Sequence, residues 1–239
     1  MKVRVGCCGF PKARKAYYRT FDLVEVQQTF YHPPRLATVR RWRAEAPPGF
    51  TFTLKAWQRI THPGRSPTYR RDRGLTPAQR EEVGFFRPTA TVLQAWEVTR
   101  AVAEALEAPL VVFQSPPSFG PSPEQVAHLR HFFRTIERGG LRLGWEPRGS
   151  LPEEWIQRLC RELDLVHVTD PFVRLPLRGV PAYLRLHGRD GYRYRYTEAD
   201  LRQLLAWVSA WEETWVLFNN VFMWEDAQRF QRLLPPSPP

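Results

Sequence analysis

The sequence is poor in cysteine, and it contains no long hydrophobic run. Its 239 residues include three cysteines, of which Cys7 and Cys8 are adjacent and Cys160 is distant. This spacing predicts neither a disulfide framework nor a zinc site. No run approaches the roughly 20 apolar residues of a membrane span, and the first strand begins at the N-terminus without a signal peptide. We therefore expect a cytoplasmic protein with no membrane association.

Lysine is also scarce, although the chain is strongly basic. Only Lys2, Lys12, Lys15 and Lys55 occur among the 35 basic residues, so arginine supplies almost all of the positive charge behind the net value of +11. Such a surface attracts polyanions, including nucleic acid and phosphorylated substrates. The arginine bias, together with 23 prolines, equally fits genome composition or a thermophile-like composition. The charge therefore leaves nucleic acid as one alternative partner.

Common phosphate-binding and nucleophile motifs are missing as well. There is no Walker-type loop and no Gly-x-Ser-x-Gly elbow. The turn at residues 6–9 (GCCG) lacks the third glycine of a dinucleotide-binding fingerprint. A doubly wound nucleotide-binding sheet is therefore the less favoured architecture.

What the sequence does contain is a regular alternation of strand and helix patterns. Strands are predicted at residues 3–8, 23–31, 50–56, 109–114, 141–146, 165–170, 182–187 and 214–220. Helices are predicted at residues 12–20, 36–46, 89–107, 123–138, 151–163, 197–211 and 223–234. Alternation of this kind predicts parallel pairing, and eight strands predict an α/β, TIM-barrel-like (β/α)8 fold in a single domain.

Three segments carry more specific expectations. The helix at 89–107 is predicted to bury Leu93, Trp96, Ala103 and Leu106. The connection at 57–88 exceeds normal loop lengths, which indicates a lid, a substrate-binding insertion or a flexible segment within residues 1–239. The proline-rich tail at 235–239 is expected to fray.

Polar residues stand in or just past the C-terminal ends of most predicted strands. In a barrel these ends meet at one mouth, where active sites form. Because an unpaired buried charge is costly, a solvated or ligand-filled mouth explains them more easily than a dry core. Glu146 could pair with Arg185, and Glu25 with Lys55. The residues concerned are Glu25, Lys55, Gln114, Glu146, Arg148, His167, Asp170, Arg185, His187, Asn219 and Asn220.

Three of these residues are candidates for catalysis. His187, which precedes Gly188, is the best candidate for proton transfer. Glu146 is either a general acid/base or the partner of an arginine. Lys55 is a solvated strand end, a phosphate anchor or a Schiff-base nucleophile.

The remaining candidates are assigned to substrate binding. Arg148 and Arg185 suit a carboxylate or phosphate, although either could serve a structural acid. The others are Glu25, Gln114, Asn219, Asp170 and His62. Each could instead have a structural role, either as part of a turn or loop or as a hydrogen-bond partner of nearby backbone groups. Ligand types for a metal occur among them, but no compact ligand spacing does. The sequence leaves metal and cofactor requirements open.

Several short motifs follow one another in order along the chain from about residue 3 to residue 227. They are 25–31 (EVQQTFY), 52–56 (FTLKA) with 60–62 (ITH), 113–119 (FQSPPSF), 145–148 (WEPR), 183–188 (YLRLHG) and 218–220 (FNN). Together they resemble the YecE-like family, catalogued as domain of unknown function 72. The resemblance implies a TIM-barrel-like fold without an established activity. Gln27 and Gln28 replace the more usual Asn-Ser pair of that family, and the longer amides are expected to narrow the mouth.

The leading hypothesis is an enzyme, such as a hydrolase, lyase or isomerase, that acts on a small anionic, phosphate-bearing or sugar-like substrate. Glu146 and His187 would move protons at the mouth. The basic and amide residues that would hold and orient the ligand are Arg148, Arg185, Lys55, Gln114 and Asn219. One alternative is a nucleic-acid-binding or nucleic-acid-processing protein that uses an arginine-rich face, with the aromatic and basic run at 192–196 stacking on bases. A second alternative is a protein that binds a ligand at the same mouth without turnover.

Overall fold

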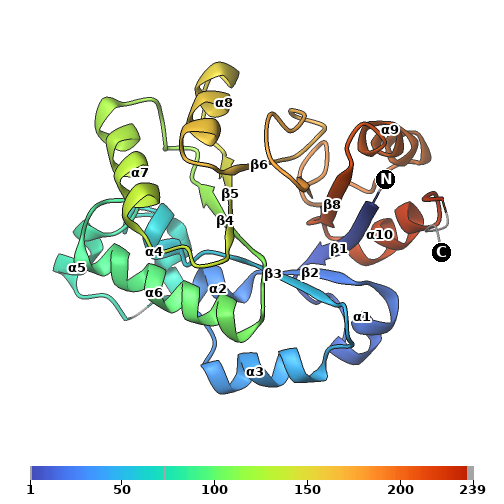
Figure 1. The fold of residues 1–239 in the computed structure, drawn as a ribbon, viewed down its shortest axis with the longest axis horizontal. Coiled ribbons are helices and arrows are strands. Elements are labelled where there is room, and N and C mark those ends of the chain that lie inside the picture. The colour runs from blue at the N-terminus through green and yellow to red at the C-terminus, as the bar shows by residue number, and fades with distance from the viewer. Residues whose placement is uncertain (1, 73, 236–239) are drawn as a thin grey trace.

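Eight parallel strands close into a barrel in which each strand pairs with the next in sequence and β1 pairs with β8. The computed structural model describes residues 2–72 and 74–235. Figure 1 shows the first strand, in blue, beside the last, in red-brown. The strands are β1 (Lys2–Cys8), β2 (Leu23–Val26), β3 (Thr51–Lys55), β4 (Leu110–Ser115), β5 (Arg142–Pro147), β6 (Val166–Thr169), β7 (Ala182–Leu186) and β8 (Glu213–Phe218).

Helices follow every strand except β6, which an irregular segment connects to β7, and they cover the outside of the barrel (Figure 1). The predicted TIM-barrel-like fold in a single domain is therefore confirmed. The helices are α1 (Arg14–Thr20), α2 (Gln28–Tyr31), α3 (Leu36–Glu45), α4 (Gln58–Thr61), the 3-10 helix η1 (Pro67–Arg71), α5 (Pro77–Glu82), α6 (Ala90–Ala105), α7 (Pro123–Thr135), α8 (Glu153–Glu162), α9 (Glu198–Val208) and α10 (Met223–Gln231).

Side chains alternate between the two faces of each strand, and this alternation separates two cores. Leu23, Val112 and Leu217 belong to a cluster that fills the inside of the barrel. The adjacent residues on those strands pack outward against the helices in a larger cluster. Cys7 lies in the outer cluster and Cys8 in the inner one, as expected for neighbours on a strand.

Two local predictions were wrong. The strand predicted at 23–31 ends at Val26 and is followed by α2, where the Thr29 hydroxyl donates to the carbonyl oxygens of Val26 at 2.9 Å and Lys55 at 2.6 Å. These bonds turn the chain across the end of β3. In α6, Leu93 is 40 % exposed, whereas Trp96 and the other predicted core positions are buried. Leu93 therefore lies on the solvent side of that helix.

The connection at 57–88 contains α4, η1 and α5. Arg59 donates to both carboxylate oxygens of Asp72 at 3.0 Å, and Thr76 begins α5 with a capping box. Gly84 has a φ of +85°, and a Cβ there would lie 2.4 Å from the backbone of His62. The segment thus consists of short helices, and its later part packs closely against its own backbone at His62. Within the tail predicted to fray, residues 236–239 lie outside the described residues.

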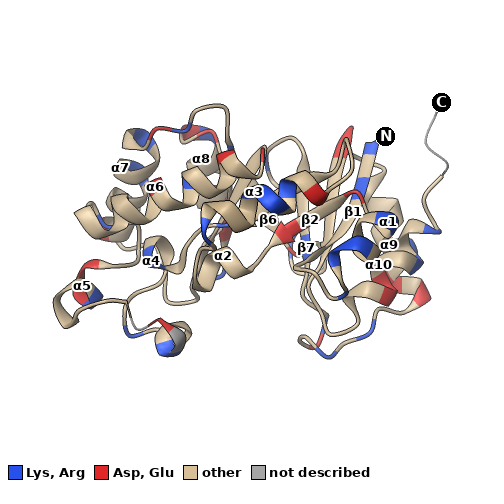
Figure 2. Ribbon diagram, turned by 90° about the horizontal axis from the view of Figure 1, so that it is seen from below, with Lys and Arg blue, Asp and Glu red and all other residues tan. Residues whose placement is uncertain are grey.

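Charged residues of both signs are interspersed on the helices. Figure 2 shows basic and acidic residues together on α3, α5 and α10. Arg100 pairs with Glu97 and Glu104 on α6, and Glu162 on α8 pairs with two arginines of α7. Among the described residues, none of the helices combines the length and the apolar character that crossing a bilayer requires.

Candidate functional site at the barrel mouth

The period-two alternation of the strands places the polar residues of the mouth inside the barrel. On β7, Tyr183 belongs to the inner core, while Leu184 and Leu186 pack outward. Arg185 therefore faces inward, one step nearer the C-terminal end than Tyr183. The same alternation makes three further residues face inward near the mouth, on β2, β4 and β5. They are Glu25, Gln114 and Glu146. As a result the inside of the barrel changes from apolar to charged towards the mouth.

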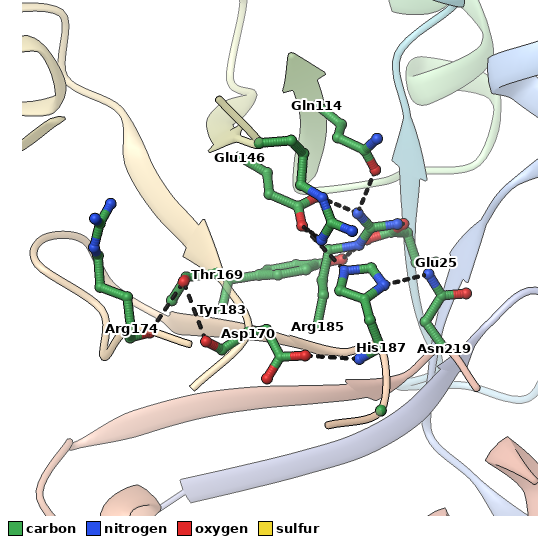
Figure 3. Close-up of polar contacts among 12 residues, drawn as sticks. Glu25, Gln114, Glu146, Thr169, Asp170, Arg174, Tyr183, Arg185, His187 and Asn219 are labelled. Atoms are coloured by element: carbon green, nitrogen blue, oxygen red, sulfur yellow. Dashed lines mark hydrogen bonds and ion pairs between the residues drawn. The ribbon is translucent and has the colours of Figure 1, made fainter. Parts of the chain in front are cut away.

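A fully buried arginine joins the charged layer together (Figure 3). Arg185 is 0 % exposed; its Nη2 lies 2.9 Å from Glu25 Oε1 and its Nη1 donates to Gln114 Oε1 at 3.0 Å. Nη1 also pairs with Glu146 Oε2. Burial by itself would lower the pKa of Arg185, but the charges of Glu146 and Glu25 raise it well above its usual value. This guanidinium is thus already paired with protein groups, and the predicted Glu146–Arg185 pair is present.

Tyr183 completes the environment of Glu25. The Tyr183 hydroxyl donates to Glu25 Oε2 at 2.8 Å and lies 2.7 Å from Thr53 Oγ1. Gln27 Nε2 donates to the other carboxylate oxygen of Glu25. Glu25 is 0 % exposed, so its partners within the barrel satisfy its charge in place of water.

Glu146 also bonds a histidine, whose ring lies between the carboxylate and an amide (Figure 3). His187 Nε2 lies 3.1 Å from Glu146 Oε1, and His187 Nδ1 lies 3.0 Å from Asn219 Nδ2. A neutral ring satisfies both contacts when Nε2–H donates to the carboxylate and Nδ1 accepts from the amide. The arrangement therefore fixes the tautomer and leaves the basic lone pair on Nδ1.

The protonation of this pair follows from burial and from the nearby arginines. Burial would raise the pKa of Glu146, but Arg185, His187 and Arg148 lower it well below its usual range. Burial lowers the pKa of His187, and its hydrogen bond to Glu146 opposes this only in part. Glu146 is therefore ionised and His187 neutral at pH 7.

Asp170 supports the histidine from the backbone side. Its Oδ2 accepts from the His187 amide at 2.8 Å and its Oδ1 from the Phe172 amide at 3.0 Å. Burial raises the pKa of Asp170, and the two amide bonds act in the opposite direction. The carboxylate links the loop after β6 to the end of β7.

The Glu146–His187 pair lines a cavity of about 310 Å³. The side chain of Arg148 is 31 % exposed while its Nη1 lies 3.0 Å from Glu146 Oε1. Arg174, which pairs with Glu153 at 3.0 Å, is 27 % exposed in the same wall. Arg148 and Arg174, unlike Arg185, can therefore reach a ligand. The wall includes Glu146, Arg148, Thr169, Arg174, His187 and Tyr192.

Lys55 and His62 lie on another side of the mouth, around Phe30. The Lys55 ammonium stands 3.6 Å from the centre of the Phe30 ring, and His62 packs edge-on against that ring at 4.9 Å. Burial, and then the charge of Arg185, lower the pKa of Lys55 to about 7. Burial and the charge of Lys55 lower the pKa of His62 to about 3. The expected Glu25–Lys55 ion pair does not occur among the contacts of the described residues, since Glu25 pairs with Arg185.

The structure thus brings most of the predicted site residues into one network. Asp170 joins it through the backbone of His187, whereas no direct bond connects Lys55 or His62 to it within the described part of the chain. The members of the network are Glu25, Gln114, Glu146, Arg148, Arg185, His187 and Asn219.

Two other predicted residues have structural partners. His167 Nδ1 accepts from the Leu177 amide at 3.1 Å, and burial lowers the pKa of His167 to about 4. Asn220 donates to Tyr194 O and to Asp226.

Sequence reasoning missed two residues of the site. Tyr183 stands two positions before Arg185 on the same face of β7, so strand alternation could have identified it. Arg174 lies in the irregular segment after β6, where no periodicity applies. Its place in the cavity wall is visible only in the folded chain.

Acidic and histidine side chains were also candidates for metal binding. Among residues 2–72 and 74–235, no three histidine, cysteine, aspartate or glutamate side chains are grouped as a metal ion requires. Arg185 occupies the space between Glu25 and Glu146 and supplies a positive charge there.

Fold and site together define a closed parallel barrel with a buried ion cluster beneath a polar mouth. The chain belongs to the family described as Protein of unknown function DUF72, whose sequence model matches residues 11–238, in agreement with the resemblance of its motifs. It is 26 % identical to the UPF0759 protein YunF of Bacillus subtilis over 87 % of this chain and 80 % of the relative.

Solved structures share the barrel fold of this chain. A DUF72 family protein of Thermotoga maritima superposes with a TM-score of 0.68 at 21 % identity, over 98 % of this chain and 99 % of the other. A xylose isomerase domain containing protein of Salmonella typhimurium gives a TM-score of 0.60 at 14 % identity, over 93 % and 91 % of the two chains. At these identities the likeness concerns the fold alone.

Proposed function

We propose that this protein is an enzyme that acts on a small anionic, phosphate-bearing or sugar-like substrate by acid–base chemistry at the barrel mouth. The observation that carries the proposal is the Glu146–His187 pair in the wall of a cavity that also contains Arg148. A neutral imidazole held by a buried carboxylate is prepared to take a proton, because the imidazolium that forms gains a charged partner.

His187 is the proton acceptor in this proposal, and Nδ1 is the accepting atom. Its present partner is the amide of Asn219, which is half-buried, and a substrate would displace that amide. Glu146 holds the ring through Nε2 and stabilises the imidazolium. The lowered pKa of His187 keeps the base deprotonated at neutral pH.

Arg148 and Arg174 would bind the anionic group of the substrate. Both side chains are partly exposed in the cavity wall, and each is held by one carboxylate, Glu146 or Glu153. An arginine held in this way presents its remaining N–H groups in a fixed direction, which suits a carboxylate or phosphate. Arg185 has a different role, because it positions Glu25 and Glu146 from within the barrel.

Solvent exchange of substrate protons tests the proposal for any reaction that begins with proton abstraction. The protein is incubated in D₂O with a panel of sugar phosphates and small hydroxy acids, and NMR records product formation or deuterium at carbon. We expect at least one compound to exchange or react, and His187→Ala to reduce its rate by about 100-fold or more. Glu146→Gln should reduce the rate as well.

Exposed residues of the same type provide matched controls. His131 on α7 and Arg161 on α8 lie on the surface, so His131→Ala and Arg161→Gln should leave the rate unchanged. Arg148→Gln should raise the substrate concentration that is needed for half-maximal rate. A panel compound that binds without any reaction in the wild-type protein would favour a ligand-binding protein without turnover and contradict the proposal.

The nucleic-acid alternative has less support. Tyr196 in the aromatic and basic run is 1 % exposed, and its hydroxyl accepts from the Gly188 amide at 2.8 Å. The Tyr194 hydroxyl donates to Asp200 at 2.6 Å. Of the three tyrosines only Tyr192, at 55 % exposed, presents a largely free ring for stacking.

A further inference from the structure

Within the described part of the chain, the charged end of Lys55 has no polar partner, unlike the other charged residues of the mouth. The residue is 6 % exposed, and among the described residues its amine forms neither an ion pair nor a hydrogen bond. Leaving a buried ammonium unpaired costs folding free energy, and arrangements of this kind concentrate at functional sites. The other buried charges of the mouth, on Glu25, Glu146 and Arg185, pair with one another.

The surroundings of Lys55 fix its backbone and cover one side of its amine. The backbone carbonyl oxygen of Lys55 accepts a hydrogen bond from the Thr29 hydroxyl at 2.6 Å. This bond ties the end of β3 to α2. The Phe30 ring, 2 % exposed, covers one side of the amine at 3.6 Å. The ring therefore blocks the approach of an electrophile from that side.

We propose that Lys55 is a nucleophilic amine that condenses with an aldehyde or ketone group, so that the site takes small carbonyl compounds that also carry an anionic group. This inference rests on the proposed function, because it names the substrate class of the same mouth. Desolvation and a neighbouring cation are the two conditions that make a lysine nucleophilic, and burial together with the charge of Arg185 supplies both.

The condensation is balanced without a further reagent. The nitrogen of Lys55 bonds to the carbonyl carbon, and the electron pair of the C=O π bond moves to oxygen. The two protons of the neutral amine leave with that oxygen as water, and a C=N bond remains. Protonation of this imine acidifies the C–H bonds next to it, so the condensation prepares a substrate for acid–base chemistry.

Reductive trapping tests the inference in the wild-type protein. The protein is treated at pH 7 with glyoxylate, a small anionic aldehyde, and sodium cyanoborohydride, and each lysine is examined by peptide mass mapping. The chain provides internal controls, because Lys2, Lys12 and Lys15 are exposed. We expect Lys55 to carry the carboxymethyl adduct at least about ten-fold faster than these three. An ordinary lysine amine, with a pKa of about 10.4, is almost entirely protonated at pH 7.

Equal labelling of the four lysines, labelling of the exposed three alone, or no labelling would overturn the inference. Lys55→Met keeps an apolar chain beside Phe30 and should abolish the fast adduct, whereas Lys15→Met should not. Acetaldehyde is the uncharged control probe. Arg148→Gln should slow the reaction of Lys55 with glyoxylate but not with acetaldehyde.

The failure of this inference can be told apart from that of the proposed function. Exchange in D₂O that depends on His187, without fast labelling of Lys55, would remove the inference and support the proposed function. Fast labelling of Lys55 without any exchange or reaction would support the amine's reactivity and contradict the proposed acid–base enzyme.

Discussion

At the scale of single residues, the charged side chains of the mouth divide according to whether the protein already satisfies them. Arg185 is enclosed and bonded to two carboxylates, so it organises the site from beneath. Arg148 keeps part of its guanidinium exposed above Glu146. Lys55 is buried and unpaired within the described structure. Three positive charges in different surroundings are therefore suited to three different roles.

Buried histidines should make the stability of the protein depend on pH. The pKa of His62 is lowered to about 3 and that of His167 to about 4, chiefly by burial. Between these values and about pH 6.5 the unfolded chain binds more protons than the folded one, so stability rises with pH. We expect the free energy of unfolding to fall by about 1.4 kcal/mol per pH unit for each histidine as the pH decreases below about 6.5.

Urea denaturation followed by tryptophan fluorescence at several pH values measures this dependence. His62→Gln should remove the contribution of one histidine, so that the free energy of unfolding falls less steeply as the pH decreases. His131→Gln, at an exposed position, should leave this pH dependence unchanged. An identical pH dependence in His62→Gln and the wild type would show that His62 is not held neutral.

The identities of the mouth residues were predictable, but their pairing was predictable only in part, since the Glu146–Arg185 pair occurs and the Glu25–Lys55 pair does not. A polar residue just past an apolar strand is visible in the sequence, and this signal found Glu146, Arg185 and His187. Whether Glu25 pairs with Lys55 or with Arg185 depends on which side chains meet across the barrel, and strand order alone does not determine this. The buried amine of Lys55 is a consequence of that choice.

At the scale of secondary-structure elements, close contacts between backbones fix where the first strands and helix lie. The Tyr17 hydroxyl on α1 accepts from the Cys7 amide at 2.7 Å and donates to Leu23 O at 2.8 Å. A Cβ on Gly6 would lie 2.0 Å from Leu23 O. Glycine at position 6 lets β1 and β2 approach, and Tyr17 joins both strands to the helix between them.

Removal of the Tyr17 hydroxyl should therefore destabilise the barrel. Tyr17→Phe leaves a buried amide on β1 and a buried carbonyl on β2 without this partner, and we expect a loss of about 2–3 kcal/mol in the free energy of unfolding. Urea denaturation at pH 7 measures it. Tyr31→Phe is the control, because Tyr31 is 44 % exposed. Equal stability of the two variants would contradict this role for Tyr17.

The elements themselves were largely predictable because their signals are local. Alternation of apolar residues, the prolines and the capping residues identified all eight strands and the long helices. The boundary between β2 and α2 was missed because Thr29 bonds the end of β3, which is distant in sequence. The short helices within 57–88 were missed for a related reason, since ion pairs such as Arg59–Asp72 hold them.

At the scale of the whole molecule, net charge and charge distribution have different consequences. The chain carries a net charge of +11, which attracts any polyanion at low ionic strength. Its arginines are interspersed with acids on the helices (Figure 2), and many are already paired, as Arg100 is with Glu97 and Glu104. Because acids neutralise many of these arginines locally, the attraction should be weak and easily screened.

We accordingly expect a fluorescent oligonucleotide to bind weakly at about 50 mM salt and to be released by about 200 mM, with little preference for sequence. Fluorescence anisotropy across a salt series measures this. Tyr192→Ala, which removes the exposed ring of the aromatic and basic run, should bind like the wild type. Binding that survives about 200 mM salt and is lost in Tyr192→Ala would mean that the run is a specific nucleic-acid surface. The net charge would then reflect a partner rather than composition, and the mouth would have to be reconsidered as a site for a polymer.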